Sequence, residues 1–178
     1  MRCFVAVPFL ETVKQQLGVL QEPVKGLRWQ KINQLHITLK FLGDVSEDKV
    51  KALQTEFSKI KMPAFSLSLQ GLGYFPKGKR PRVLWAGVEE NQSLRKLRDK
   101  VEGICVSAGF KAGARPFMPH ITLARVKGAS GDEVESLITR NQQLKIHDIP
   151  VDEFVLYESK LHSMGAEHIR LKSFGLGE

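Results

Sequence analysis

The sequence predicts an α+β fold with two lobes, formed by a single domain over residues 1–178. Short segments of β-rich, alternating residues are mixed with segments of helical periodicity, and several strand segments follow each other as hairpins. No linker rich in Pro, Gly or Ser separates independent domains. The tetrapeptide His-Ile-Thr-Leu occurs once in each half, at 36–39 and 120–123. This repeat, with a rough repeat of element order, indicates two similar lobes.

The first half is expected to alternate strands and helices. Residues 2–7 are β-branched and aromatic, as in a strand, and residues 9–21 place Leu10, Val13, Leu17 and Leu20 at helical spacing. Alternation returns over 34–42. Ser46, followed by two acids, is expected to cap a second helix, because a hydroxyl and early carboxylates suit the positive helix end. The apolar face of this helix is expected to carry Val50, Leu53 and Phe57. Two further strands, over 65–75 and 82–88, complete this half.

The second half follows the same order. Asn91 is expected to cap the best helix of the chain, over residues 91–109, with Gly109 as its stop. Its predicted apolar stripe is Leu94, Leu97, Val101 and Ile104. A strand is expected over 119–126 and a helix over 131–140, and a closing hairpin over 153–161 and 167–174.

Composition favours an anionic partner. The chain has 27 Lys and Arg against 19 Asp and Glu, a net charge of +8, so its surface should attract polyanions such as nucleic acid or acidic lipid. The alternative is that the charge only keeps the protein soluble. Residues 77–82, Lys-Gly-Lys-Arg-Pro-Arg, are a basic turn that is either an RNA-backbone contact or a solvated hairpin tip. Cys3 and Cys105 form no Cys-x-x-Cys pair, which favours a reducing compartment. With no signal peptide and no membrane span expected, we predict a cytoplasmic, monomeric protein.

The repeated tetrapeptide carries the chemistry. On a strand, His36 and Thr38 share one face while Ile37 and Leu39 share the other, and the same holds for His120 and Thr122. If the two lobes pack about a pseudo-two-fold axis, two imidazoles and two hydroxyls line one cleft. Two histidines on opposite sides of a substrate can act as general base and general acid in one step. In-line attack of water on a phosphodiester fits this set.

Arg125 lies five residues beyond His120, and a guanidinium is suited to bidentate phosphate binding. In a regular strand its odd offset would point it away from the histidine, unless a bend redirects it. No metal site and no cofactor are predicted, because Thr is a poor zinc ligand and no acidic residue accompanies either motif.

The chain resembles the two-histidine (2H) phosphoesterase superfamily, and within it the RNA 2′,3′-cyclic phosphodiesterase branch, historically called 2′-5′ RNA ligase. The resemblance is carried over nearly the whole chain by five segments: "RCFVAVPF", "LHITLKFLGDV", "PRVLWAGV", "FMPHITLARV" and "FVLYESKLHSMGAEHIRL". The family often has a tyrosine near the position of His168. The resemblance implies a bilobal α+β fold whose antiparallel sheets line a central cleft, with helices outside.

The resemblance also implies a reaction. The family hydrolyses 2′,3′-cyclic phosphates at RNA 3′ ends, leaving a 2′-phosphate. By this analogy His36 is the general acid, His120 is the general base, Thr38 and Thr122 hold non-bridging oxygens, and Arg125 helps to neutralise the phosphate. Two alternatives remain open: 2′-5′ ligation by the reverse reaction, and a non-catalytic RNA-binding module. A related cyclic nucleotide, such as ADP-ribose cyclic phosphate, also remains open as substrate.

Four aromatic residues complete the expectations. Trp29, Phe9 and Phe117 could stack on a base, since aromatic rings serve as platforms for single-stranded nucleic acid. Core packing is favoured for each of them, and Trp85 is predicted to lie in the core.

Overall fold

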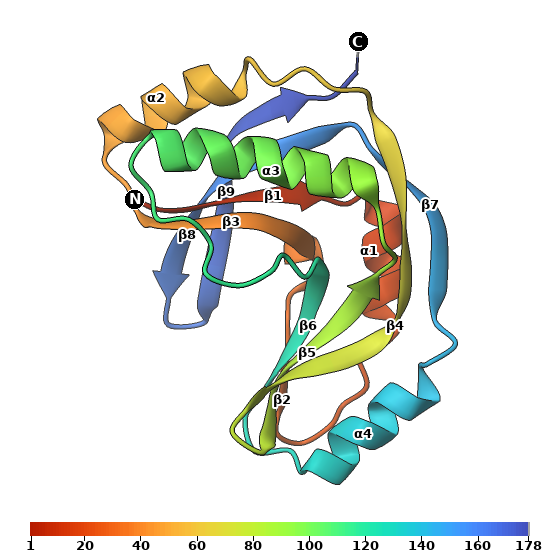
Figure 1. The fold of residues 1–178 in the computed structure, drawn as a ribbon. Coiled ribbons are helices and arrows are strands. Elements are labelled where there is room, and N and C mark those ends of the chain that lie inside the picture. The colour runs from red at the N-terminus through yellow and green to blue at the C-terminus, as the bar shows by residue number, and fades with distance from the viewer. Residues whose placement is uncertain (178) are drawn as a thin grey trace.

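A computed structural model describes residues 1–177, and within them nine strands form one antiparallel sheet (Figure 1). The strand order is β7-β4-β5-β6-β3-β1-β8-β9, and β2 pairs with β6. The strands are β1 (Arg2–Pro8), β2 (Leu27–Trp29), β3 (His36–Asp44), β4 (Phe65–Lys77), β5 (Arg80–Val88), β6 (His120–Val126), β7 (Lys145–Val151), β8 (Glu153–His162) and β9 (Gly165–Gly175). The helices are α1 (Glu11–Gly18), α2 (Glu47–Phe57), α3 (Gln92–Ser107), α4 (Gly131–Arg140) and the short 3-10 turn η1 (Ile32–Gln34). The predicted α+β class is confirmed.

Two groups of strands make up this sheet. We call β1, β3, β8 and β9 the terminal lobe, and β2, β4, β5, β6 and β7 the central lobe. Between β3 and β6 a single Cα pair is in register, Ile37 with Ile121, so the lobes meet at one point in the sheet. Figure 1 shows the strands of the two lobes running in different directions on either side of this junction.

The lobes do not correspond to the two halves of the chain. β8 and β9 come from the C-terminal end, yet β8 pairs with β1 and so completes the lobe that begins at the N-terminus. The expectation of one lobe for each half is therefore wrong. Because the pairing of β8 with β1 joins residues about 150 positions apart, local sequence patterns carry no signal for it.

The helices begin where capping residues predict. Ser46 Oγ accepts a hydrogen bond from Lys49 N at 3.3 Å to cap α2, and Asn91 Oδ1 accepts one from Leu94 N at 2.9 Å to cap α3. α3 contacts α2 and β3, and α4 contacts β4 and β5, so each lobe carries helices on its buried face. One face of each helix thus becomes part of a continuous apolar core.

The helical stripes are largely as predicted. Val13 and Leu17 of α1 are buried, and so is Leu20 just beyond it, whereas Leu10 precedes the helix and is 55% exposed. In α3, Cys105 fills the core position predicted for Ile104, which is only half-buried.

Strands β2 and β7 were not predicted. Within residues 1–177, no helix is both long and apolar enough to cross a membrane.

Candidate active site

His36 begins β3, and two hydrogen bonds fix its ring. Its Nδ1 lies 2.6 Å from the carbonyl oxygen of Gln34, and its Nε2 lies 3.0 Å from Thr38 Oγ1. A carbonyl oxygen only accepts, so Nδ1 carries the proton and donates it. In the neutral ring Nε2 therefore keeps its lone pair and accepts from the Thr38 hydroxyl. This confirms that His36 and Thr38 share one face of the strand.

His120 begins β6 with the same arrangement. Its Nδ1 lies 2.7 Å from the carbonyl oxygen of Met118, again two residues earlier in the chain. Both imidazoles are thus held by the backbone in one tautomer, and each presents Nε2 for proton transfer.

The Ile37–Ile121 pair relates the two motifs to each other. Because the strands are antiparallel, His36 lies on the same side of this pair as Thr122, and Thr38 on the same side as His120. A positive charge on His120 also acts to lower the pKa of His36, so the two rings are near enough to interact electrostatically. We call the sheet face that carries these four residues the site face.

The same irregularity follows each motif. In β3, Val5 pairs with Lys40 and Ala6 pairs with Thr38, which leaves Leu39 as an extra residue. In β6, Leu84 pairs with Ala124 and Trp85 pairs with Thr122, which leaves Leu123 as the extra residue. Each strand therefore has a β-bulge directly after its His-Ile-Thr segment.

The bulge decides where Arg125 points. Leu123 and Ala124 are both buried in the core, so two successive side chains turn to the same face and the alternation is reset. Arg125 is exposed and returns to the site face with His120 and Thr122. Simple alternation fails here because β6 is not a regular strand.

In β3 the equivalent bulge brings Phe41 to the site face. Leu39 lies in the core and the side chain of Lys40 turns towards α3, which leaves Phe41 73% exposed, with its ring 6.3 Å from that of Phe4. Phe41 thus holds in the first motif the position that Arg125 holds in the second.

Aromatic rings flank each histidine. Phe4 lies 5.0 Å from His36 between ring centroids and stacks on Tyr157 at 5.1 Å. Phe75 meets His120 edge-on at 4.8 Å, and Trp85 lies 6.4 Å from His120. The histidines are therefore supported by rigid apolar groups, which restrict the orientation of each ring.

The prediction that Trp85 lies in the core is wrong. The residue is half-buried and lies on the site face, where its ring crosses Gly73 of β4. A Cβ at Gly73 would stand only 2.3 Å from the indole, so glycine is required for this close approach. Trp85 therefore supports the His120 side of the site.

His168 is a neighbour of His36 that sequence patterns did not reveal as part of the site. Its ring lies 5.4 Å from that of His36 at an angle of 72°, and 4.9 Å from Phe4. Burial lowers the pKa of His36 to about 4, and charges on His168 and His120 act in the same direction as burial. Burial also lowers the pKa of His168. At neutral pH both rings are therefore neutral in the unliganded protein.

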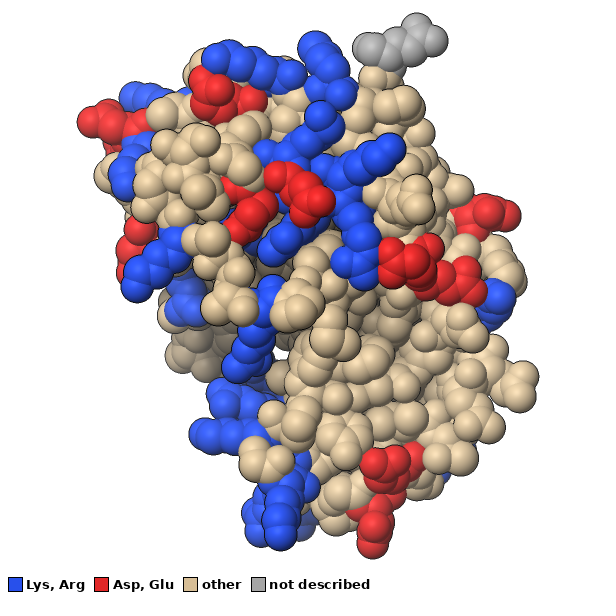
Figure 2. Space-filling model, viewed as in Figure 1, with Lys and Arg blue, Asp and Glu red and all other residues tan. Residues whose placement is uncertain are grey.

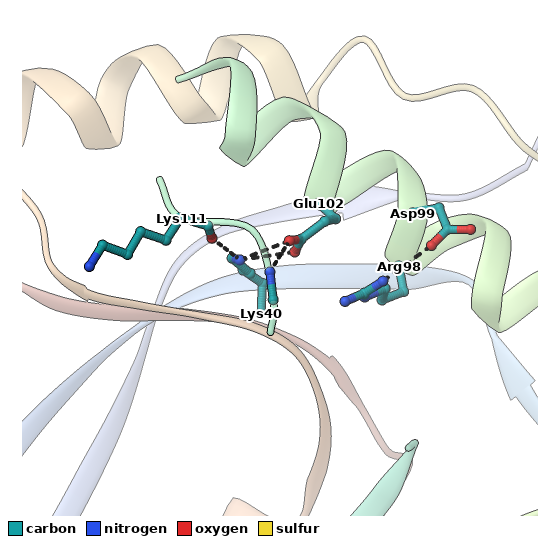
Figure 3. Close-up of polar contacts among 6 residues, drawn as sticks. Lys40, Arg98, Asp99, Glu102 and Lys111 are labelled. Atoms are coloured by element: carbon teal, nitrogen blue, oxygen red, sulfur yellow. Dashed lines mark hydrogen bonds and ion pairs between the residues drawn. The ribbon is translucent and has the colours of Figure 1, made fainter. Parts of the chain in front are cut away.

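The segment that leads from α3 to His120 is anchored to β3 (Figure 3). Lys40 Nζ donates to Glu102 Oε1 at 3.0 Å and to the carbonyl oxygen of Lys111 at 2.7 Å, and Glu102 Oε1 accepts from Gly113 N at 2.7 Å. The side chains of Lys40 and Glu102 are only 10% and 14% exposed. This ion pair links the bulge after the first motif to the segment that precedes the second.

The other aromatic candidates serve packing. Phe9 is buried in the core, and Trp29 and Phe117 pack against it. Trp29 Nε1 also donates to the carbonyl oxygen of Glu22 at 2.8 Å, and the guanidinium of Arg98 lies 5.3 Å from the Phe117 ring. No group of three or more His, Cys, Asp or Glu side chains suited to a metal ion occurs within residues 1–177.

A comparison with protein families finds one family that matches both parts of the chain that carry the His-Ile-Thr-Leu motifs. The family described as LigT-like phosphoesterase matches residues 7–85 and 87–166, and each matched segment contains one His-Ile-Thr-Leu motif. The chain belongs to the LigT-like phosphoesterase family. The resemblance drawn from the motifs is thus confirmed.

Relatives of the chain share a name. The chain is 38% identical over 132 residues to a protein of Aeropyrum pernix, covering 73% of this chain and 75% of that one. It is 34% identical over 171 residues to a protein of Thermotoga maritima, covering 93% and 90%. Both proteins are named RNA 2′,3′-cyclic phosphodiesterase.

Solved structures share the fold. A crystal structure of a phosphoesterase superposes with a TM-score of 0.80 at 28% identity, over 99% of this chain and 98% of that one. E. coli LigT complexed with 3′-AMP superposes with a TM-score of 0.79 at 27% identity, over the same shares of the two chains. The arrangement of strands around the site therefore matches that of LigT-like phosphoesterases.

Proposed function

We propose that the protein hydrolyses 2′,3′-cyclic phosphates at RNA 3′ ends to 2′-phosphomonoesters, by general acid–base catalysis without a metal ion. The observation that carries this proposal is the pair of imidazoles whose Nδ1 atoms are held by backbone carbonyls at 2.6 and 2.7 Å. Two Nε2 atoms on one face can take and give a proton in the same displacement. The name RNA 2′,3′-cyclic phosphodiesterase, shared by relatives at 34–38% identity, supports the choice of substrate.

The reaction is a displacement at phosphorus. His120 Nε2 takes a proton from water while the water oxygen bonds to phosphorus. The bond from phosphorus to the ribose 3′ oxygen breaks, and His36 Nε2–H gives its proton to that oxygen. The product keeps the phosphate on the 2′ oxygen, and a proton passing from His120 to His36 through solvent restores the starting state.

The remaining site residues stabilise the phosphate. The hydroxyls of Thr38 and Thr122 hold the two non-bridging oxygens, and the guanidinium of Arg125 offsets the negative charge that grows at phosphorus. Phe41, exposed on the same face, offers a ring on which the base of the substrate can stack.

The product of hydrolysis tests this function. A short RNA that ends in a 2′,3′-cyclic phosphate, incubated with the protein in EDTA, is expected to give a 2′-phosphate end. Mass spectrometry combined with a 3′-specific phosphatase identifies the product, because only a 3′-phosphate is removed. A 3′-phosphate product would contradict the assigned leaving oxygen, and loss of activity in EDTA would contradict metal independence. Binding without turnover would favour the RNA-binding module.

The protonation of His36 provides a second test. In the free protein its pKa is lowered to about 4, so an acid role requires the bound phosphate to raise it. A phosphate anion next to the ring favours the imidazolium. Titration of the His36 ring by NMR is therefore expected to give a pKa of about 4 without ligand and a clearly higher pKa with a nucleoside 2′-phosphate.

The same titration can reverse the assignment of roles. If the pKa of His36 stays at about 4 in the complex, His36 remains neutral and must act as the base. His120 would then protonate the leaving oxygen. Recording the His147 ring of β7 in the same spectra provides a control for direct effects of ionic strength.

A further inference from the structure

Arg28 lies beside Arg125 on the site face. In the pairing of β2 with β6, Arg28 stands directly opposite Arg125. Leu27 and Trp29, on either side of it, pack against the core, so the side chain of Arg28 takes the other face. Both arginines are exposed. The sheet therefore sets two guanidinium groups next to each other in one cross-strand row.

Within residues 1–177, neither of these guanidinium groups has a carboxylate partner or donates a hydrogen bond to the protein. Four other arginines among the described residues are paired with acids: Arg95 with Glu90, Arg98 with Asp99, Arg140 with Glu22 and Arg170 with Glu153. Like charges directly opposite each other on a sheet are destabilising. An anion bound across the row removes this repulsion, so the pair is suited to a ligand with negative charge.

Arg28 also reaches towards the other lobe. A Cβ placed on Gly165 would lie 3.3 Å from its Nη2 atom, so the guanidinium of this central-lobe residue stands next to the β8–β9 turn of the terminal lobe. Lys and Arg side chains gather along the lower left of Figure 2, in the region where Figure 1 places β2 and the β4–β5 turn. This part of the central lobe therefore presents a basic surface.

We propose that Arg28 binds the phosphodiester that joins the terminal nucleotide to the rest of the RNA chain. This inference rests on the proposed function. One guanidinium fork engages one phosphate in a bidentate manner. With Arg125 at the cyclic phosphate, a second phosphate requires a second guanidinium, and Arg28 supplies it from the neighbouring strand. A mononucleotide has no such phosphate, so Arg28 selects RNA ends over free cyclic nucleotides.

The selectivity ratio tests this role. We would measure kcat/KM for a five-nucleotide RNA ending in a 2′,3′-cyclic phosphate and for a nucleoside 2′,3′-cyclic phosphate. In the Arg28→Ala variant the ratio of the two is expected to fall about tenfold or more, because a charge-assisted hydrogen bond is worth about 1.5–3 kcal/mol. A plot of log KM for the RNA against the logarithm of the salt concentration should also have a shallower slope, by about the amount that one phosphate contact contributes.

Two further variants sharpen the result. Arg28→Lys keeps the charge but loses the fork, and should recover part of the ratio. Lys51→Ala removes the same charge from α2, on the far side of the core, and should leave the ratio at the wild-type value. Circular dichroism confirms that each variant is folded.

Two outcomes would overturn the proposal. An unchanged ratio in Arg28→Ala would show that Arg28 meets no phosphate beyond the reacting one. An equal fall in Lys51→Ala would show that net charge, not position, sets the preference. Failure of the wild-type protein on both substrates is a separate result, which rejects the proposed function and this role with it.

Discussion

Replacing His120 with alanine is expected to lower kcat for a cyclic phosphate end by a factor of about 10³, since one positioned acid or base contributes about 10²–10⁴. The variant keeps Thr122, Arg125 and the aromatic neighbours, so KM should change little. Single-turnover hydrolysis of a cyclic-phosphate RNA measures the chemical step. The site geometry provides the reason: the Met118 carbonyl oxygen, 2.7 Å from Nδ1, holds the reactive nitrogen in place, and no other described residue takes the same position.

Replacing His36 with alanine should have an effect of similar size, and the two losses should not add. If both histidines act in one displacement, the double variant is expected to be only slightly slower than either single variant. The His147→Ala variant changes an exposed histidine of β7 and should retain full activity. A loss of less than about tenfold in either single variant would contradict paired acid–base catalysis.

Replacing Lys40 with methionine is expected to lower the free energy of unfolding by about 3 kcal/mol, because removing one partner of a buried pair leaves the other charge uncompensated. Glu102 would then lie between α3 and β3 with only Gly113 N as a hydrogen-bond donor. Urea denaturation followed by circular dichroism measures the change. Lys59→Met provides the matched control, since the Lys59–Glu56 pair is 65% and 49% exposed and should contribute little.

The pH dependence of this loss follows from Glu102. Burial acts to raise its pKa, but hydrogen bonds from Gly113 N and Lys40 outweigh it and hold the pKa below its usual 4.5. The folded state therefore favours the carboxylate, and the stabilisation is present above pH 4.5 and is lost as pH falls through the lower, folded-state pKa. The difference between wild type and Lys40→Met should shrink at acid pH. A difference that is constant with pH would contradict the ion pair as its source.

A double variant separates charge from packing. Lys40→Met combined with Glu102→Leu removes both charges, and much of the lost stability should return, because a buried ion pair is often replaceable by apolar residues. Failure to recover would indicate that the anchoring of the segment at Lys111 and Gly113, rather than the charge, carries the effect.

Most of the secondary structure could be predicted from local patterns. The alternation over 34–42 and 119–126 and the caps Ser46 and Asn91 were confirmed, because strand faces and helix starts depend on residues close in the chain. β2 has only three residues, too few for alternation to be recognised. It forms because β6 offers it a paired edge, and this brings Arg28 to the site.

Three features depended on contacts between strands. The bulges after each motif arise in the pairing of β3 with β1 and of β6 with β5, so the direction of Arg125 could not be read from its offset. The position of Trp85 depends on Gly73 in the neighbouring strand. The proximity of His168 to His36 depends on a sheet in which β8 separates β9 from β1.

The sequence by itself determined the family, the α+β class and the two His-x-Thr faces, because a repeated motif with period-two alternation is a local property of the chain. The tertiary structure alone decided that both faces meet, through one residue pair between lobes that do not follow the order of the chain. It also set the protonation of His36, since burial and neighbouring rings come from residues distant in sequence. Strand pairing is a long-range interaction, and the chemistry of this site depends on it.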